Sequence, residues 1–175
     1  MESITSLKKL LEVLPECENQ DYFDLAKNLK IPEEDLLPFA FWSNETYTRN
    51  CVVRTEDYEL LLLCWEKGQD TPIHSHNGEE CWVYLAEGEL REKRFVLQNE
   101  KLGKEADVKM TESKLSYMND DLGYHSLHNI NNGRSMSLHL YVGPIDECSI
   151  YESEIDQFVT KELDYYSKKG NLILN

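Results

Sequence analysis

The placement of histidine is the feature of this 175-residue sequence with the clearest chemical meaning. The chain has five histidines, and two of them form the motif His74-Ser75-His76. We expect this motif to lie on a β-strand, where alternate residues face the same side. Two adjacent imidazoles are typical ligands of a first-row transition metal. The motif therefore indicates a metal site, with the identity of the metal left open.

A second group of reactive side chains alternates along the segment Ser137-Leu138-His139-Leu140-Tyr141. On a strand, the serine, histidine and tyrosine share one face and the two leucines share the other. Either the apolar face is the core and the polar face meets water, or the polar face lines a ligand cavity. In the second case the three polar groups could form a hydrogen-bond relay that aims the phenol at a metal. Composition alone does not separate these two interpretations.

The elements that must position these residues fall into two parts. Residues 1–42 are predicted to be helical, because Leu7, Leu10 and Leu14 recur at helical spacing before Pro15. Short apolar runs separated by Gly, Asn and Asp then predict strands at residues 58–65, 80–85, 90–96, 135–142 and 157–166. Such strands are typical of a β-sandwich or barrel. We expect one domain, residues 1–175, with a helical cap (1–42) on a mainly β barrel (43–175).

Charge, hydropathy and cysteine content argue against several classes of protein. The formal net charge of −15 opposes binding to nucleic acid or to anionic membranes. The longest apolar run, Leu60–Trp65, is too short to span a bilayer. The first residues lack a basic region followed by an apolar block, so we expect a cytoplasmic protein. Five cysteines without a Cys-x-x-Cys pair argue against a disulfide framework or a zinc–thiolate site.

Glycine spacing around the histidine pair resembles the first motif of the cupin family. That motif reads Gly-x₅-His-x-His-x₃₋₄-Glu-x₆-Gly, and Gly68 and Gly88 match its two glycines. Cys81 stands at its glutamate position, with Glu80 beside it. The alignment on Cys81 keeps the gap to Gly88, and Glu80 would face the other side of a strand. We therefore expect no carboxylate among the metal ligands.

The turn Gly123-Tyr124-His125, followed by Asn129, resembles the second cupin motif. This resemblance implies a small jelly-roll-like β-barrel in which His74, His76 and His125 bind one metal ion. Three neutral imidazoles would leave the ion its full charge and open positions for substrate and O₂. Such a site suits a bidentate anionic ligand such as an amino-thiolate. His128 has no partner in either motif, and we expect it to be structural or exposed.

Within the cupins, the resemblance is closest to the cysteine dioxygenase family. The segments that carry it are Tyr47–Asn50, Leu63–Trp65 with Pro72–His76, Leu122–His125 and Ser137–Tyr141. The resemblance implies that the three histidines bind Fe(II), and that L-cysteine reacts with O₂ to give cysteine sulfinic acid. It also implies that Arg49 pairs with the substrate carboxylate, for which a guanidinium fork is well suited.

The same resemblance implies further roles in the pocket. Tyr47 would add a hydrogen bond to the substrate. Tyr141 would lie beside the bound thiol and oxygen, supported by His139 and Ser137. In part of the family, the residue matching Cys81 forms a thioether bond to the tyrosine matching Tyr141, and both partners are present in this chain. Without that bond, Cys81 is expected to be a buried free thiol.

Two departures from the family pattern lie close to the pocket. The family often has Ser-Pro-Pro after the tyrosine, whereas this chain has Val142-Gly143-Pro144, so the backbone there could differ. Ser75 stands between the two histidines where aspartate is frequent. That position should face away from the metal, so we expect little effect.

Three other functions remain open on the sequence alone. Oxidation of another small thiol, such as 3-mercaptopropionate, is disfavoured by Arg49, because relatives acting on that substrate tend to carry glutamine there. A zinc or nickel isomerase or lyase would need a carboxylate ligand, which Glu80 would have to supply. A non-enzymatic small-molecule-binding cupin would not need three intact histidines. We expect a monomeric enzyme whose partners are L-cysteine and O₂.

Overall fold

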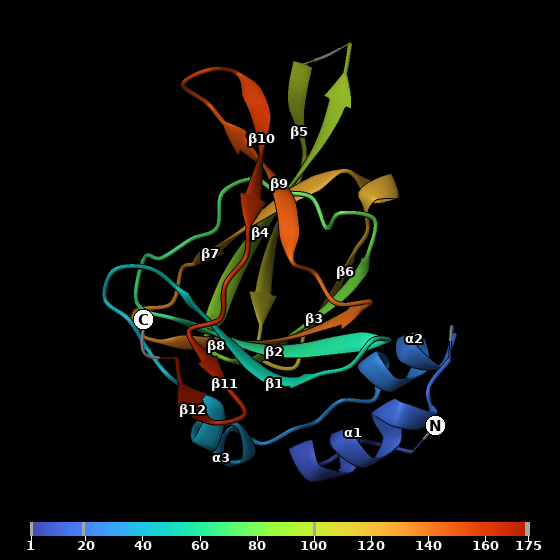
Figure 1. Cartoon of the computed structure of the whole chain (residues 1–175). Helices are drawn as coiled ribbons and strands as arrows, with labels where there is room; N and C mark the ends of the chain where they lie inside the picture. Colours follow the sequence, from blue (N-terminus) through green and yellow to red (C-terminus); the bar gives the residue numbers. More distant parts are fainter. Residues whose placement is uncertain (1, 19, 100, 174–175) are drawn as a thin grey trace.

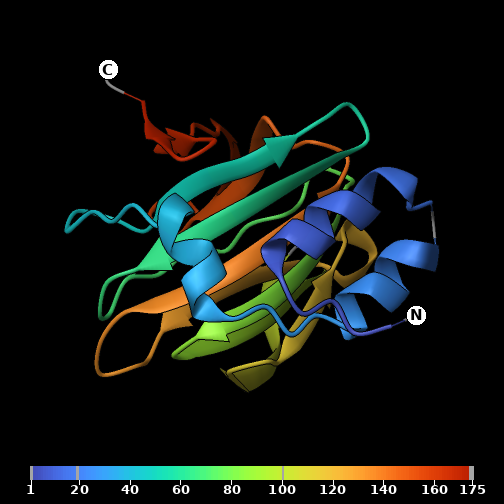
Figure 2. The ribbon, with the colours of Figure 1, turned by 90° about the horizontal axis from the view of Figure 1, so that it is seen from below.

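A helical cap and a set of β-sheets make up the part of the chain that the computed structural model describes, residues 2–18, 20–99 and 101–173. The cap contains α1 (Leu7–Val13), η1 (Leu14–Glu16), α2 (Gln20–Lys27), α3 (Glu33–Leu36) and η2 (Leu37–Phe39). Ser6 begins α1, since its hydroxyl accepts a hydrogen bond from the Lys9 backbone N–H at 3.1 Å. The helices lie across one face of the largest sheet (Figures 1 and 2). The predicted N-terminal helical cap is therefore confirmed.

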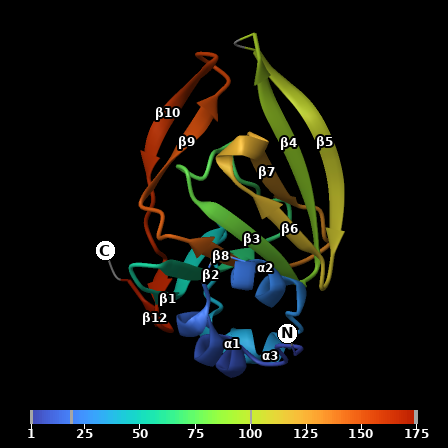
Figure 3. The ribbon, with the colours of Figure 1, turned by 90° about the vertical axis from the view of Figure 1, so that its right-hand side faces the viewer.

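The strands of the described residues are arranged in three sheets. The largest has the order β12 (Asn171–Leu172), β11 (Ser167–Lys168), β1 (Thr48–Arg54), β2 (Tyr58–Trp65), β8 (Ser135–Val142), β3 (Glu80–Glu87) and β6 (Leu115–Met118). The second has the order β5 (Lys101–Thr111), β4 (Glu89–Gln98) and β7 (Tyr124–Asn129), and the third pairs β10 (Gln157–Glu162) with β9 (Glu147–Glu152). In Figure 3 the β4–β5 and β9–β10 hairpins rise on opposite sides, above the large sheet.

The central strands of the large sheet are buried on both faces. Along β2, Leu60 and Leu62 pack against the helical cap, whereas Leu61 and Leu63 face the interior between the sheets. Strand β8 alternates in the same way, with the apolar residues of its outer face on the cap. The unbroken apolar run of β2 is thus explained, because a strand covered on both faces has no water-facing side. The cap is what allows the polar face of β8 to turn inward.

The histidine motif is not on a regular strand, contrary to our expectation. His74 forms isolated bridges with His125 of β7 and with Ile150 of β9, and the residues around it are irregular. Pro72 lacks an N–H and therefore cannot take part in a continuous ladder there. The backbone of His74 both donates to and accepts from His125, with N···O distances of 2.9 and 3.1 Å. The motif is a connecting segment held between two sheets.

The predicted strand at residues 157–166 is shorter than expected. Strand β10 ends at Glu162, and the chain then turns towards the edge of the large sheet. The Leu163 N–H donates to Asp146 O and the Tyr166 N–H donates to Arg49 O, each at 2.8 Å. The second contact places Tyr166 beside β1, with which β11 pairs in parallel.

Substitution of Leu62 by alanine tests the two-sided burial of β2. Leu62 is fully buried against the cap. We expect the Leu62→Ala variant to lose about 3 kcal/mol of unfolding free energy, because the deletion leaves a cavity in a packed site. Urea denaturation measures this loss. Leu97→Ala, at an exposed position of β4, is the matched control, with an expected loss of about 0.5 kcal/mol or less. Equal losses in the two variants would contradict this packing.

Candidate metal and substrate site

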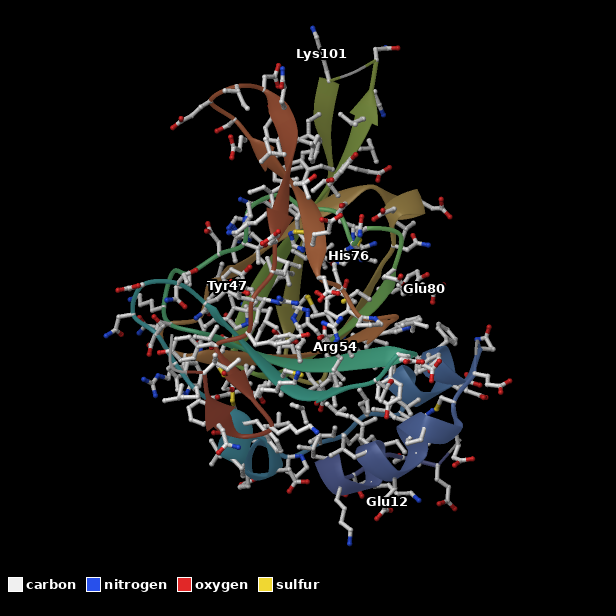
Figure 4. The ribbon with its side chains drawn as sticks, in the orientation of Figure 1. Glu12, Tyr47, Arg54, His76, Glu80 and Lys101 are labelled. Atoms are coloured by element: carbon white, nitrogen blue, oxygen red, sulfur yellow. The ribbon has the colours of Figure 1, made fainter. Side chains whose placement is uncertain are left out.

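Three histidines from separate segments meet in the interior between the sheets. One ring nitrogen from each of His74, His76 and His125 lies within 4.8 Å of the others. The ring centroids are 4.6–5.3 Å apart. His76 and His125 are almost completely buried, and Figure 4 shows His76 well inside the molecule. The two predicted motifs are therefore brought together, although the first lies on a loop.

The hydrogen bonds of His74 and His125 each occupy one ring nitrogen and leave the other available as a ligand. His74 Nδ1 lies 3.0 Å from Pro72 O, and a carbonyl only accepts, so this nitrogen carries the hydrogen. The same reasoning applies to His125 Nδ1, which lies 2.9 Å from Glu92 Oε1. Both ring nitrogens of His76 are buried without a hydrogen-bond partner in the described part of the chain. Such an orphaned buried imidazole fits a metal ligand.

Burial keeps the site in the protonation state that a metal needs. Burial, reinforced by the neighbouring His125, lowers the pKa of His74 from its ordinary 6.5 to about 3. Burial and the other imidazoles also hold the pKa of His76 well below its ordinary value. Both rings are neutral at pH 7 and can donate lone pairs without first losing a proton.

Glu92 is a buried carboxylate that orients His125 and that sequence reasoning missed. Its Oε2 accepts hydrogen bonds from the Ser116 hydroxyl at 2.7 Å and from Arg94 Nη2 at 3.1 Å. Burial alone would raise the pKa of Glu92, but the His125 hydrogen bond and the nearby charges outweigh it and lower the pKa. The residue lies in a charged run that looks solvent-exposed, and its only sequence signal is the two-residue spacing from buried Leu90.

The polar face of β8 lines this interior, which decides between the two interpretations of that strand. Ser137 Oγ lies 2.9 Å from His139 Nε2 and accepts a hydrogen bond from Trp65 Nε1, also at 2.9 Å. The His139 and Tyr141 rings are stacked with centroids 6.4 Å apart. Among the described residues, no hydrogen bond joins these two side chains, so the full relay stays a prediction.

Cys81 and Tyr141 are direct cross-strand partners. They pair in the register of β3 with β8, and both are buried. Burial, followed by the neighbouring Cys81, raises the pKa of Tyr141 well above its ordinary value. Glu80, the alternative carboxylate, is exposed and does not belong to the histidine group; Figure 4 shows it away from His76.

A cavity connects His74 with the predicted substrate residues. Tyr47, Arg49, His139 and Tyr141 line it together with His74. The Tyr47 ring stacks on Trp65, with centroids 4.8 Å apart, and Arg49 Nη1 donates to Asp164 O at 3.2 Å. Leucine and isoleucine side chains supply most of the remaining wall. Cys148 of β9 and Lys161 of β10 also line the cavity, and sequence reasoning did not place either of them there.

A comparison with protein families assigns the chain. The family model for cysteine dioxygenase type I matches residues 3–154. This chain belongs to the cysteine dioxygenase type I family. The resemblance expected from the sequence is thereby confirmed. The match ends before residues 157–166, which contribute Lys161 and Leu163 to the cavity wall.

Relatives and solved structures agree with this assignment. The chain is 29% identical to cysteine dioxygenase type 1 of Danio rerio over 153 residues, covering 84% of this chain and 76% of the relative. It is also 29% identical to the Homo sapiens protein of that name over 137 residues, with coverages of 75% and 68%.

Two solved structures resemble the fold. A Klebsiella pneumoniae protein with a double-stranded β-helix domain has a TM-score of 0.53 at 15% identity, over 63% of this chain and 84% of that chain. A Thermus thermophilus protein has a TM-score of 0.52 at 20% identity, over 62% of this chain and 94% of that chain. These likenesses concern the fold, and they confirm the expected mainly β, cupin-type architecture.

The segment that departs from the pattern of the cysteine dioxygenase family has a structural explanation at Gly143. Its φ is +100°, in a region that L side chains rarely adopt, and its N–H donates to Asp57 O at 2.8 Å. A Cβ at this position would also collide with the Glu79 carboxylate.

His128 lies outside the histidine group, and its Nδ1 lies 3.2 Å from Asp70 Oδ2. None of the helices in the described ranges is long and apolar enough to cross a membrane.

Substitution of Glu92 by glutamine tests its support of His125. We expect Glu92→Gln to weaken the binding of a divalent transition metal by roughly 10- to 100-fold, because a neutral amide orients and polarises the imidazole less well. Competition between the protein and a chelator for Co(II) measures the affinity. Glu89→Gln, at a more exposed position of the same strand, should bind Co(II) as the unmodified protein does. Unchanged affinity in Glu92→Gln would show that the carboxylate does not support a metal ligand.

Proposed function

We propose that this protein is an Fe(II)-dependent thiol dioxygenase that oxidises L-cysteine with O₂ to cysteine sulfinic acid. The observation that carries the proposal is a group of three histidines, with no carboxylate in it among the described residues, beside a cavity that His74 and Arg49 both line. Family membership supports the same reaction. The reaction R–SH + O₂ → R–SO₂H needs no further reductant, because sulfur supplies all four electrons.

The histidine group would hold the iron. Bound Fe(II) would lower the pKa of the substrate thiol. It would also provide a redox path between a spin-paired thiolate and triplet O₂. His74, His76 and His125 add no negative charge, so an anionic thiolate is favoured at the remaining positions. Glu92 and Pro72 fix two of the three rings. The protein's own contribution is thus orientation and charge.

Arg49 would bind the substrate carboxylate. Its side chain is about one-tenth exposed, and Nη2 has no hydrogen-bond partner among the described residues. A buried, unpaired N–H of a guanidinium is a strong site for an anionic oxygen. Leu63, Leu127 and Ile150 give the same cavity an apolar wall. Tyr47, on the same wall, would add a hydrogen bond.

Tyr141 would donate a hydrogen bond to the substrate while its sulfur is oxidised. Its raised pKa keeps the phenol protonated at neutral pH, so the O–H remains a donor to the negative charge that develops there. His139 and Ser137 would support this ring from the same face of β8. Burial lowers the pKa of His139 well below its ordinary value, so it acts as a neutral group.

Arg49→Gln tests the proposed activity and its carboxylate contact together. With the iron-loaded protein we expect O₂ uptake and sulfinate formation from L-cysteine. In Arg49→Gln the KM for L-cysteine should rise by roughly 10- to 100-fold, because a charge-assisted hydrogen bond is lost. Oxygen-electrode measurements of O₂ uptake with L-cysteine, 3-mercaptopropionate and cysteamine show which of the three thiols is the preferred substrate. Arg91→Gln, at a half-exposed position of β4, is the matched control.

The outcomes are distinct. Removal of iron with a chelator should abolish uptake with every thiol. Absence of oxidation of all three thiols by the iron-loaded protein would refute the dioxygenase proposal. A preference for 3-mercaptopropionate would keep the reaction type and overturn the substrate.

We also propose the thioether bond between Cys81 and Tyr141, which direct cross-strand pairing supports. Its formation joins Sγ to the phenol ring, and O₂ accepts the two hydrogens that are lost. Intact-mass measurement after aerobic turnover should show a loss of about two mass units, one for each departing hydrogen. Peptide mapping should place it at these two residues. Cys81→Ser should abolish the loss, whereas Cys148→Ser should retain it; an unchanged mass after turnover would rule the bond out.

A further inference from the structure

A carboxylate is buried directly behind Arg49. Glu59 of β2 is fully buried, beside the interior-facing Leu61 and Leu63. A buried charge is strongly destabilising unless it is paired. Two arginines and one tyrosine surround this one: Arg49, Arg54 and Tyr165. None of these contacts follows from the sequence motifs.

The two oxygens of Glu59 have different surroundings. Oε1 accepts a hydrogen bond from the Tyr165 hydroxyl and lies 3.6 Å from Arg54 Nη1. Oε2 lies 3.8 Å from Arg49 Nη2, which is too long for a hydrogen bond. Both Oε2 and Nη2 are buried without a hydrogen-bond partner among the described residues. Glu59 and Arg49 therefore face each other without a hydrogen bond between Oε2 and Nη2.

Tyr165 is itself held in place from the other side. Arg54 Nη1 donates to the Tyr165 oxygen at 2.6 Å, and the two terminal nitrogens of Arg54 bind the Asp146 carboxylate at 2.7 and 2.8 Å. Arg54 is the last residue of β1 and is labelled in Figure 4. The Tyr165 ring also lies next to Arg49, with its centroid 5.4 Å from Cζ. The next residue, Tyr166, donates its N–H to Arg49 O of β1.

We infer that Tyr165 is a positioning residue that holds the Glu59 carboxylate away from Arg49, so that Arg49 Nη2 stays available to the carboxylate of a substrate. The inference rests on the proposed function in assigning that ligand to Arg49. A shift of about 1 Å would close the gap between Oε2 and Nη2 to hydrogen-bonding distance. Glu59 would then compete with the substrate for the same N–H groups.

Tyr165→Phe tests this role because it keeps the ring and removes only the hydroxyl. We expect the Kd and the KM for L-cysteine to rise roughly tenfold, since a freed Glu59 pairs with Arg49. The kcat should stay within about twofold of the unmodified protein, because the reacting groups are untouched. Cysteamine, which has no carboxylate, should bind with unchanged Kd.

A double variant separates positioning from a structural role. Glu59→Gln combined with Tyr165→Phe should recover most of the affinity for L-cysteine, because a neutral amide competes poorly for Arg49. Tyr166→Phe, at the exposed neighbouring position, should behave as the unmodified protein. Equal loss of L-cysteine and cysteamine binding in Tyr165→Phe, or no recovery in the double variant, would overturn the inference.

Anaerobic calorimetry with the iron-loaded protein makes the result independent of turnover. If the unmodified protein fails to oxidise L-cysteine, the proposed function fails. The carboxylate-specific change in Kd still decides the role of Tyr165. If the unmodified protein binds L-cysteine no better than cysteamine, Arg49 does not bind the substrate carboxylate. The inference about Tyr165 is then refuted as well.

Discussion

Two backbone hydrogen bonds between His74 and His125 hold together the parts of this structure on which its chemistry depends. They join a segment before β3 to a strand that follows β6, and so bring the two histidine motifs together. The same segment donates a hydrogen bond from Ser75 N–H to Ser149 O of β9 at 2.9 Å. A loop would ordinarily be mobile, but this one is bonded on both sides. The rings it carries can therefore keep a fixed geometry without belonging to a strand.

The interior combines charges that would each be unstable alone. Burial keeps His74 and His76 neutral, and Glu92 accepts hydrogen bonds from its neighbours. Arg49 and Glu59 face one another without closing. The surface has a large excess of acid, yet Arg49 and Lys161 line the cavity. This local positive charge offsets the repulsion that a substrate carboxylate would otherwise meet on approach.

Local patterns predicted a large part of the architecture. The bounds of β2 and β8 agree with their apolar and alternating runs, and the helical cap follows from its leucine spacing and prolines. The histidine group could be anticipated because both motifs are short and contiguous. The loop that carries His74 was wrongly expected to be a strand. Its bonds go to β7 and β9, which no local pattern specifies.

The supporting residues could not be anticipated for the same reason. Glu92 lies among charged neighbours, and Glu59 stands at the start of an apolar run, so neither has a sequence context that predicts burial. Tyr165 follows a hairpin that is mostly polar. In each case burial is decided by a segment distant in the chain. A single sequence records which side chains are present, but such pairings arise only when the sheets meet.

The three histidines come from two distant parts of the sequence, and this separation has a thermodynamic consequence. In the unfolded chain His125 is far from the adjacent pair His74 and His76, so a metal ion cannot engage all three together until the sheets have formed. An ion that binds only the assembled group stabilises the whole fold in proportion to the logarithm of its free concentration. Supply of the metal and the amount of folded protein thus become one coupled equilibrium.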